Sequence, residues 1–213
     1  MKTIRTIVLL SLIYTNSFAQ NTIKLTYQNT NTISKENLSS LPKEIQEVAL
    51  IQMQNSYTAS YLFLQGDDVF FLKKKEESEN NQKGKIASNG NTIFKDLSLT
   101  VNSPEIRIQK NSKTNTYTHN ENNKLNSGNL SKVIWNITTN KKKILGFNCT
   151  EAIGKYSTKT VTVYFTKEIK AKGSPNTIPF IDGVVLEYST DKQSGIATKI
   201  EYKQPAIKNF FKQ

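Results

Sequence analysis

The feature that most limits what this chain can fold into is a series of short segments in which polar and apolar residues alternate. A period of two places successive side chains on opposite faces of a β-strand, whereas an α-helix needs a period near 3.6. Glycine and asparagine, which favour tight turns, stand between many of these segments. The pattern predicts a mainly β domain with a single antiparallel sheet, either curved or rolled into an open barrel. The predicted strands cover residues 22–27, 57–65, 68–73, 92–100, 105–110, 115–119, 132–138, 143–147, 149–154, 158–166, 183–188 and 196–202.

One stretch has helical spacing instead. Pro42 follows Ser39 and Ser40, a typical entry into a helix. Apolar or long side chains then recur every three or four residues, which predicts one short amphipathic helix near residues 42–54. Because we find no internal repeat and no proline-rich linker, we expect residues 20–213 to form a single β domain with minor α content.

The first residues have the three parts of a secretory signal peptide. Lys2 and Arg5 precede an apolar run over residues 7–13, and Ser17 and Ala19 are the small residues that a signal peptidase recognises. We therefore expect residues 1–19 to be a signal peptide, and the mature protein to reside in the periplasm or in association with an outer membrane. No stretch is long enough to predict a transmembrane span. A lipoprotein is not expected, because the sole cysteine lies far from the cleavage point.

The net charge and the scarcity of arginine, cysteine and histidine exclude several classes of function. Lysine and arginine number 29 against 17 aspartates and glutamates, for a net charge of +12. Only Arg5 and Arg107 are arginines, and an exported, arginine-poor chain is not expected to bind nucleic acid. Cys149 is the only cysteine and His119 the only histidine, so no internal disulfide can form. The same two counts leave too few ligands for a Cys/His metal site, and neither a metal nor a cofactor is expected.

The common catalytic signatures are missing. The glycine-rich nucleotide loops and the G-x-S-x-G motif do not occur, and a Ser-His-Asp site would depend on His119 in a polar segment. Ser40 lies in an S-x-x-K match but is interpreted as a helix cap. The carboxylates Asp67 and Asp68 are interpreted as part of a turn, and the glutamates over residues 76–79 as part of a solvated loop. No catalytic residue is predicted, which favours a protein that is not an enzyme.

Two basic runs, residues 73–75 and 141–143, can be interpreted either as structural or as functional. The favoured one is that they flank hairpins and keep the protein soluble. The alternative is contact with an anionic lipid or polymer.

Cys149 is interpreted as a buried, inert thiol, with a reactive thiol as the alternative. Trp135 is interpreted as a core residue.

The second half of the chain has an ordered set of motifs. K-V-I-W over residues 132–135 is followed by K-I-L-G-F-N-C-T-E-A over 143–152, V-T-V-Y-F-T over 161–166, G-S-P over 173–175 and P-F-I-D-G-V-V-L-E over 179–187. This order resembles the GLPGLI family of exported proteins of Bacteroidetes. Asp182 stands where the family motif has proline, and Phe180 where it has the first glycine, so this chain resembles a divergent member. The residues that match or stand in the motif positions are Trp135, Gly146, Cys149, Tyr164, Gly173, Pro175, Asp182 and Gly183.

The resemblance implies export and a structural role for these residues, with no activity attached. Gly183, preceded by Asp182, would supply a tight turn into a strand that begins at Val184.

Two functions of different classes remain open from the sequence. The first is a non-enzymatic binding or envelope-assembly protein whose curved sheet holds an apolar or anionic envelope ligand, or which contacts an envelope protein. The second is a hydrolase of cell-envelope material that uses carboxylates such as Asp67 or Asp182. The hydrolase requires those acids to converge on one pocket, whereas the binding protein does not.

Overall fold

The strands of the protein account for almost all of its regular structure. A computed structural model of the 213-residue chain describes residues 22–31, 39, 42–43, 46, 57–80, 99–121, 124–156 and 159–212. The predicted signal peptide lies outside these residues. The strands are β1 (Thr22–Asn31), β2 (Thr58–Gln65), β3 (Asp68–Lys73), β4 (Glu76–Asn80), β5 (Leu99–Ser103), β6 (Ile106–Asn111), β7 (Thr116–Glu121), β8 (Lys124–Asn129), β9 (Ile134–Ile144), β10 (Phe147–Tyr156), β11 (Lys159–Thr166), β12 (Val184–Ser189) and β13 (Gln193–Gln204).

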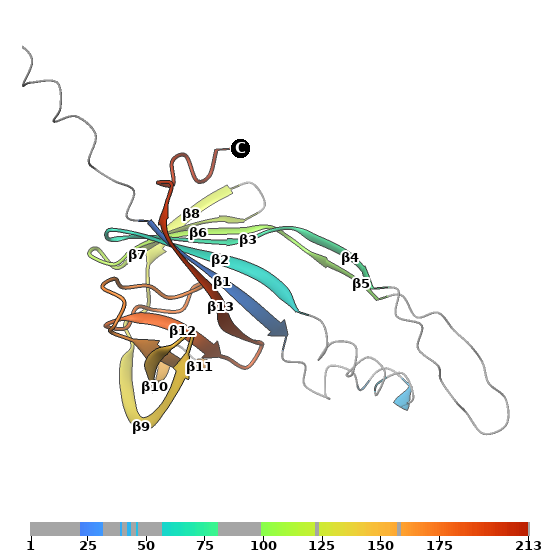
Figure 1. Cartoon of the computed structure of the whole chain (residues 1–213). Helices are drawn as coiled ribbons and strands as arrows, with labels where there is room; N and C mark the ends of the chain where they lie inside the picture. The colour runs from blue at the N-terminus through green and yellow to red at the C-terminus, as the bar shows by residue number, and fades with distance from the viewer. Residues whose placement is uncertain are drawn as a thin grey trace, which may run out of the picture.

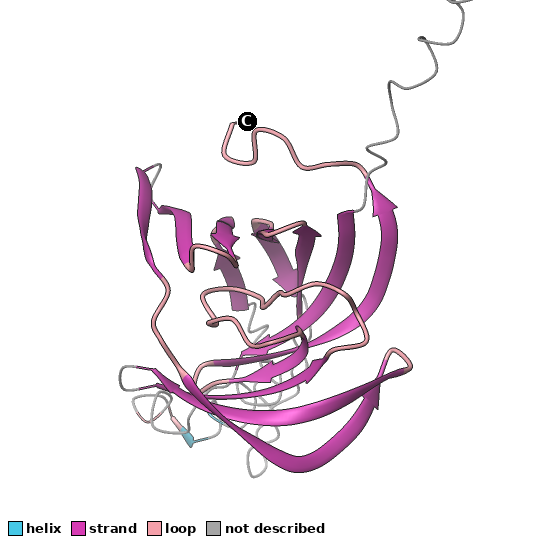
Figure 2. Ribbon diagram, turned by 90° about the vertical axis from the view of Figure 1, so that its left-hand side faces the viewer, coloured by secondary structure: helices cyan, strands magenta, loops and turns pink. Residues whose placement is uncertain are grey.

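Eleven of the strands form one antiparallel sheet in the order β8-β7-β6-β3-β2-β1-β13-β12-β11-β10-β9. The sheet curves strongly, as Figures 1 and 2 show, and it stays open because no pairing among the described residues joins β8 to β9. The predicted single, curved antiparallel sheet is therefore confirmed. In the middle of the sheet β1 pairs with β13, with Thr22 opposite Gln204 and Asn31 opposite Gln193.

The remaining strands, β4 and β5, pair with each other in a two-stranded ribbon. In Figure 1 this ribbon continues β3 and β6 away from the large sheet. β4 lies in a polar segment that the sequence pattern does not mark as a strand, and so does β8. Most of β8 is exposed to solvent, so its residues have no reason to alternate.

Little of the predicted helix lies in the described part of the chain. Lys43 and Gln46 are helical, and the Gln46 amide donates a hydrogen bond to the Pro42 carbonyl at 3.0 Å. The rest of residues 42–54 lies outside the described residues. Where the chain is described, no helix has the length and apolar character needed to cross a membrane.

The hydrophobic core lies on the inner side of the curved sheet. Leu25, Leu62 and Phe71 face one another across β1, β2 and β3 at successive register positions, and each is almost completely buried. Their burial is the main free-energy gain of the sheet, because apolar surface removed from water contributes about 25 cal/mol per Å². The core is completed by Ile169, Ile178 and Ile181 from the connection between β11 and β12.

That connection, residues 167–183, runs along the inside of the sheet, and we call it the inner loop (Figure 2). A side chain at Gly173 would collide with Leu64 of β2, so the loop backbone lies directly against the sheet there. From the edge strand β9, the indole nitrogen of Trp135 donates to the Phe180 carbonyl at 3.0 Å. The inner loop therefore touches strands from both halves of the open sheet.

A buried lysine holds the middle of the inner loop. Lys110 on β6 is completely buried, and its ammonium group donates to the Ser174 carbonyl, to the Ser174 hydroxyl at 2.8 Å and to the Ile178 carbonyl at 3.1 Å. It also lies 5.0 Å from the ring centroid of Phe180. Burial lowers the pKa of Lys110 well below its usual value. Three acceptors match the three hydrogens of an ammonium group, so the inner loop replaces the water that Lys110 loses.

We expect Lys110→Met to destabilise the protein by about 1–3 kcal/mol, because it removes the donor to the buried Ser174 carbonyl, whereas the Ile178 carbonyl still accepts from the Ser174 hydroxyl. The free energy of unfolding from urea denaturation measures the effect. The matched control is Lys155→Met on the exposed part of β10, for which we expect no more than about 0.5 kcal/mol. Equal stability of the two variants would contradict the role assigned to Lys110.

Candidate functional site

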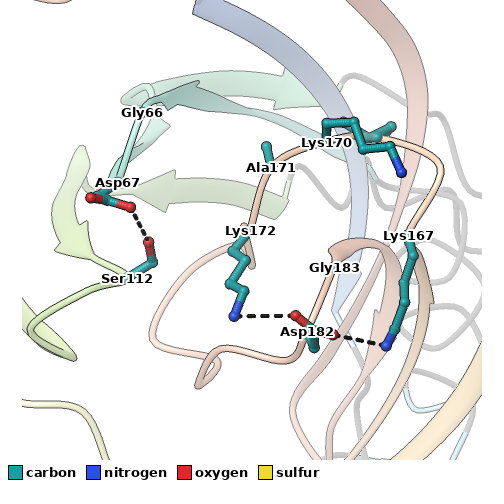
Figure 3. Close-up of a pocket in the computed structure, with 10 residues that line it drawn as sticks. Gly66, Asp67, Ser112, Lys167, Lys170, Ala171, Lys172, Asp182 and Gly183 are labelled. Atoms are coloured by element: carbon teal, nitrogen blue, oxygen red, sulfur yellow. Dashed lines mark hydrogen bonds and ion pairs between the residues drawn. The ribbon is translucent and has the colours of Figure 1, made fainter.

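A pocket of about 480 Å³ opens where the inner loop meets two turns of the sheet, and Figure 3 shows its lining. One turn joins β2 to β3 and the other joins β6 to β7, so segments distant in the sequence meet here. We call it the lysine pocket, after the residue type that dominates its charge. It is lined by Gly66, Asp67, Ser112, Lys167, Ile169, Lys170, Ala171, Lys172, Asp182 and Gly183.

Backbone geometry fixes the two turns relative to each other. Gly66 has a φ of 61°, in the left-handed region that glycine adopts without strain, and it begins the two-residue connection from β2 to β3. The Ser112 amide donates to the Asp67 carbonyl at 2.8 Å, which ties the second turn to the first. The Ser112 hydroxyl also lies 3.5 Å from a carboxylate oxygen of Asp67. These two residues form one wall of the pocket.

The opposite wall holds a carboxylate between two lysines, as Figure 3 shows. Asp182 lies 2.8 Å from the Lys167 ammonium and 3.1 Å from that of Lys172. The hydrogen bonds from Lys167 and Lys172 lower the pKa of Asp182 below its usual value. Asp182 is therefore ionised at neutral pH and accepts hydrogen bonds, which is the wrong protonation state for a general acid.

Lys170 lies between the two other lysines in the sequence, and its side chain also lines the pocket. It forms no ion pair and no hydrogen bond with any residue that the structure describes. The pocket thus has three ammonium groups and two carboxylates. Within the described ranges no cluster of three or more metal-ligating side chains occurs, and the pocket contains no histidine. The lining can bind a negatively charged or hydroxyl-rich molecule through direct hydrogen bonds.

Gly183 positions Asp182 at the end of the inner loop. Its φ is 152°, and a side chain there would lie 2.5 Å from the Thr166 carbonyl oxygen, so the position admits only glycine without movement of the backbone. β12 begins at the next residue.

Among the sequence-predicted residues, Asp182 and Gly183 line the pocket, while Gly173 and Pro175 are buried elsewhere in the same inner loop.

The other motif residues lie away from the pocket. Trp135 supports the inner loop from β9, as described above, and Gly146 has a φ of 86° in the turn between β9 and β10. Tyr164 on β11 donates to Glu151 at 3.0 Å, and the Lys142 ammonium lies 3.7 Å from its ring centroid. The structure therefore does not gather the eight motif residues into one site.

Cys149 on β10 is buried in the core. Its sulfur lies 3.6 Å from the Phe147 carbonyl, and burial raises the pKa of the thiol to about 11. A protonated thiol is a weak nucleophile. The structure favours the inert thiol over the reactive one.

The two candidate acids, Asp67 and Asp182, do line one pocket, although the sequence did not show that they would meet. Sequence reasoning missed the lysines of the inner loop, Lys167, Lys170 and Lys172. The sequence does contain one indication of them: three lysines fall within residues 167–172, in a segment without polar–apolar alternation, which is typical of a polar connection between strands. It missed Lys110 as well, whose position two residues after Ile108 places it on the inner face of β6.

The comparisons with known proteins agree with the fold. A family model described as "N-glycanase peptide, N-terminal domain" matches residues 98–212. Because the match covers more than half of the chain, the protein belongs to this family. The matched range contains β5 to β13, and with them most of the lysine pocket.

Two solved structures of PNGF-II, in the C2 and P21 space groups, share the fold. Each has a TM-score of 0.55 and 19% sequence identity and covers 88% of this chain. The matched region is 28% and 29% of the PNGF-II chains, so this protein spans less than a third of their length. No curated protein matches the sequence.

We expect the Cys149 thiol to react slowly with a disulfide reagent in the native protein at pH 8. With a pKa of about 11, only about one thiol in a thousand is ionised at that pH. The raised pKa means that reactivity should increase as the pH rises toward 11. Absorbance after addition of the reagent measures the rate, which should rise about a hundredfold on unfolding.

The matched control is Ser131→Cys, which adds an exposed thiol to the same protein. This variant should show one fast and one slow thiol. Two fast thiols would contradict the burial of Cys149.

Proposed function

We propose that this protein is an exported glycan-binding domain, and that it binds a saccharide in the lysine pocket without cleaving it. Support for a glycan-related role comes from its family, whose description names N-glycanases. Support for binding comes from the pocket, which opens to solvent, has both charged and apolar lining, and is about the size of a small-molecule site. The activity of the longer PNGF-II proteins belongs to those proteins, of which this chain matches less than a third.

The observation that carries the proposal is the state of Asp182. Hydrolysis of a glycosidic bond by two carboxylates needs one of them protonated near neutral pH, which requires a raised pKa. In this pocket two lysines lower the pKa of Asp182 instead. Asp67 lies on the other wall beside Ser112, where no feature of the described residues marks it as an acid catalyst. This arrangement suits a binding site better than a catalytic one.

The lining also suits a saccharide. Lysine ammonium groups and the Ser112 hydroxyl donate hydrogen bonds, and the Asp67 carboxylate accepts them, so both kinds of partner for sugar hydroxyls are present. Ala171 and Gly66 add small surfaces against which the C–H face of a sugar ring can pack.

The proposed location follows from the signal-like residues 1–19, which precede β1. A periplasmic or outer-membrane-associated position places the domain where envelope or extracellular glycans occur. The resemblance to the GLPGLI family supports export by the same route, and we keep membership of that family as part of the proposal.

A second candidate function is hydrolysis that uses Asp67 and Asp182. It is favoured by one observation, that both acids line the same pocket. It requires a ligand that displaces the lysines from Asp182.

A glycopeptide assay distinguishes the two functions. We expect the purified protein to bind saccharides released from N-glycopeptides, measured by isothermal titration calorimetry, and to release no glycan from the intact glycopeptide, measured by mass spectrometry. Asp67→Asn and Asp182→Asn should leave the glycopeptide equally intact. The control variant is Asp191→Asn in the exposed β12–β13 turn.

Glycan or sugar release that disappears in Asp67→Asn or Asp182→Asn, but persists in Asp191→Asn, would establish the hydrolase instead. If the protein neither binds the released saccharides nor cleaves the glycopeptide, the proposed function is overturned.

A further inference from the structure

We infer that the saccharide bound in the lysine pocket carries a negatively charged group, a carboxylate or a sulfate, and that Lys170 is the cation that contacts it. This inference rests on the proposed function and names the ligand class for the same pocket. Two features carry it: the charge of the lining and the unequal pairing of its lysines.

The lining has an uncompensated positive charge. Lys167, Lys170 and Lys172 all come from six consecutive residues of the inner loop, and like charges so close together repel one another. Asp182 accepts from the first and the third of these lysines, at 2.8 and 3.1 Å. Lys170 forms no ion pair with a described residue, so its ammonium is the group available for an anion that enters the pocket.

The pocket also contains groups for the uncharged part of the ligand. Asp67 and Ser112 lie on the wall opposite Asp182, and Figure 3 shows them across the pocket from the lysines. They can bond sugar hydroxyls while Lys170 bonds the acidic group. The lysine ammonium is a compact charge, unlike the planar fork of arginine, so it can donate hydrogen bonds to a carboxylate and to a sulfate alike.

Asp182 has an opposing role in this arrangement. It holds Lys167 and Lys172 in place, and its own charge repels an anion near Lys170. The inference therefore predicts opposite effects of two substitutions: Lys170→Gln weakens binding of the acidic ligand, and Asp182→Asn strengthens it. An asparagine keeps the size and the acceptor oxygen of the aspartate, so the pocket keeps its shape.

The test compares lactose with sialyllactose and with sulfated lactose, which add a carboxylate and a sulfate to the same sugar. We expect the full chain to bind both acidic sugars about tenfold more tightly than lactose at low salt, by calorimetry, with the preference reduced at high salt. Lys170→Gln should remove most of that preference, and Asp182→Asn should increase it. The matched control is Lys192→Gln, an exposed lysine of the β12–β13 turn.

The outcomes separate the two proposals. Equal binding of acidic and neutral sugars overturns the inference and leaves the glycan-binding function standing. Inorganic sulfate that binds as tightly as sulfated lactose would show a simple anion site and overturn the saccharide part. A preference that survives Lys170→Gln but is lost in Lys192→Gln would show that the pocket is the wrong site. If none of the three sugars binds, the test fails at the proposed function itself.

Discussion

The contact between the buried ammonium of Lys110 and the inner loop is the interaction on which the rest of the structure depends. An open sheet of eleven strands leaves its concave side exposed to water, and the inner loop fills that side with apolar residues. A loop with so much backbone in the core needs partners for its carbonyl groups. Lys110 donates to two of those carbonyls, and Trp135 donates to a third from β9, near the opposite end of the strand order.

The sequence predicts the class of fold well because alternation is a local property. It predicts most strands of the large sheet but misses β8 there, and it misses β4 in the two-stranded ribbon, because the polar residues of both strands carry no pattern. It cannot predict that β1 lies beside β13, because pairing between distant segments leaves no local mark. For the site, Asp67, Asp182 and Gly183 stand out in the sequence, yet their meeting depends on how the inner loop crosses the sheet. Lys110 escapes notice since lysines are rarely buried.

The function depends on a balance of charge inside one pocket. The same two aspartates would suggest acid–base chemistry in a pocket without lysines, whereas here Lys167 and Lys172 keep Asp182 ionised. This is why the proposed role differs from hydrolysis although the family description names N-glycanases. The lysines that prevent one function make another available, since they offer hydrogen-bond donors and positive charge to a ligand.

The pairing of β1 with β13 has a consequence for how the protein comes to be folded. The partner of Thr22 is Gln204, so the centre of the sheet joins strands separated by nearly the whole sequence. Contacts over such long separations form slowly, because bringing distant segments together costs loop-closure entropy before the contacts compensate for it. The centre of this sheet cannot form until both β1 and β13 are available to pair. We therefore expect the pairing of β1 with β13 to be a late step in the folding of this domain.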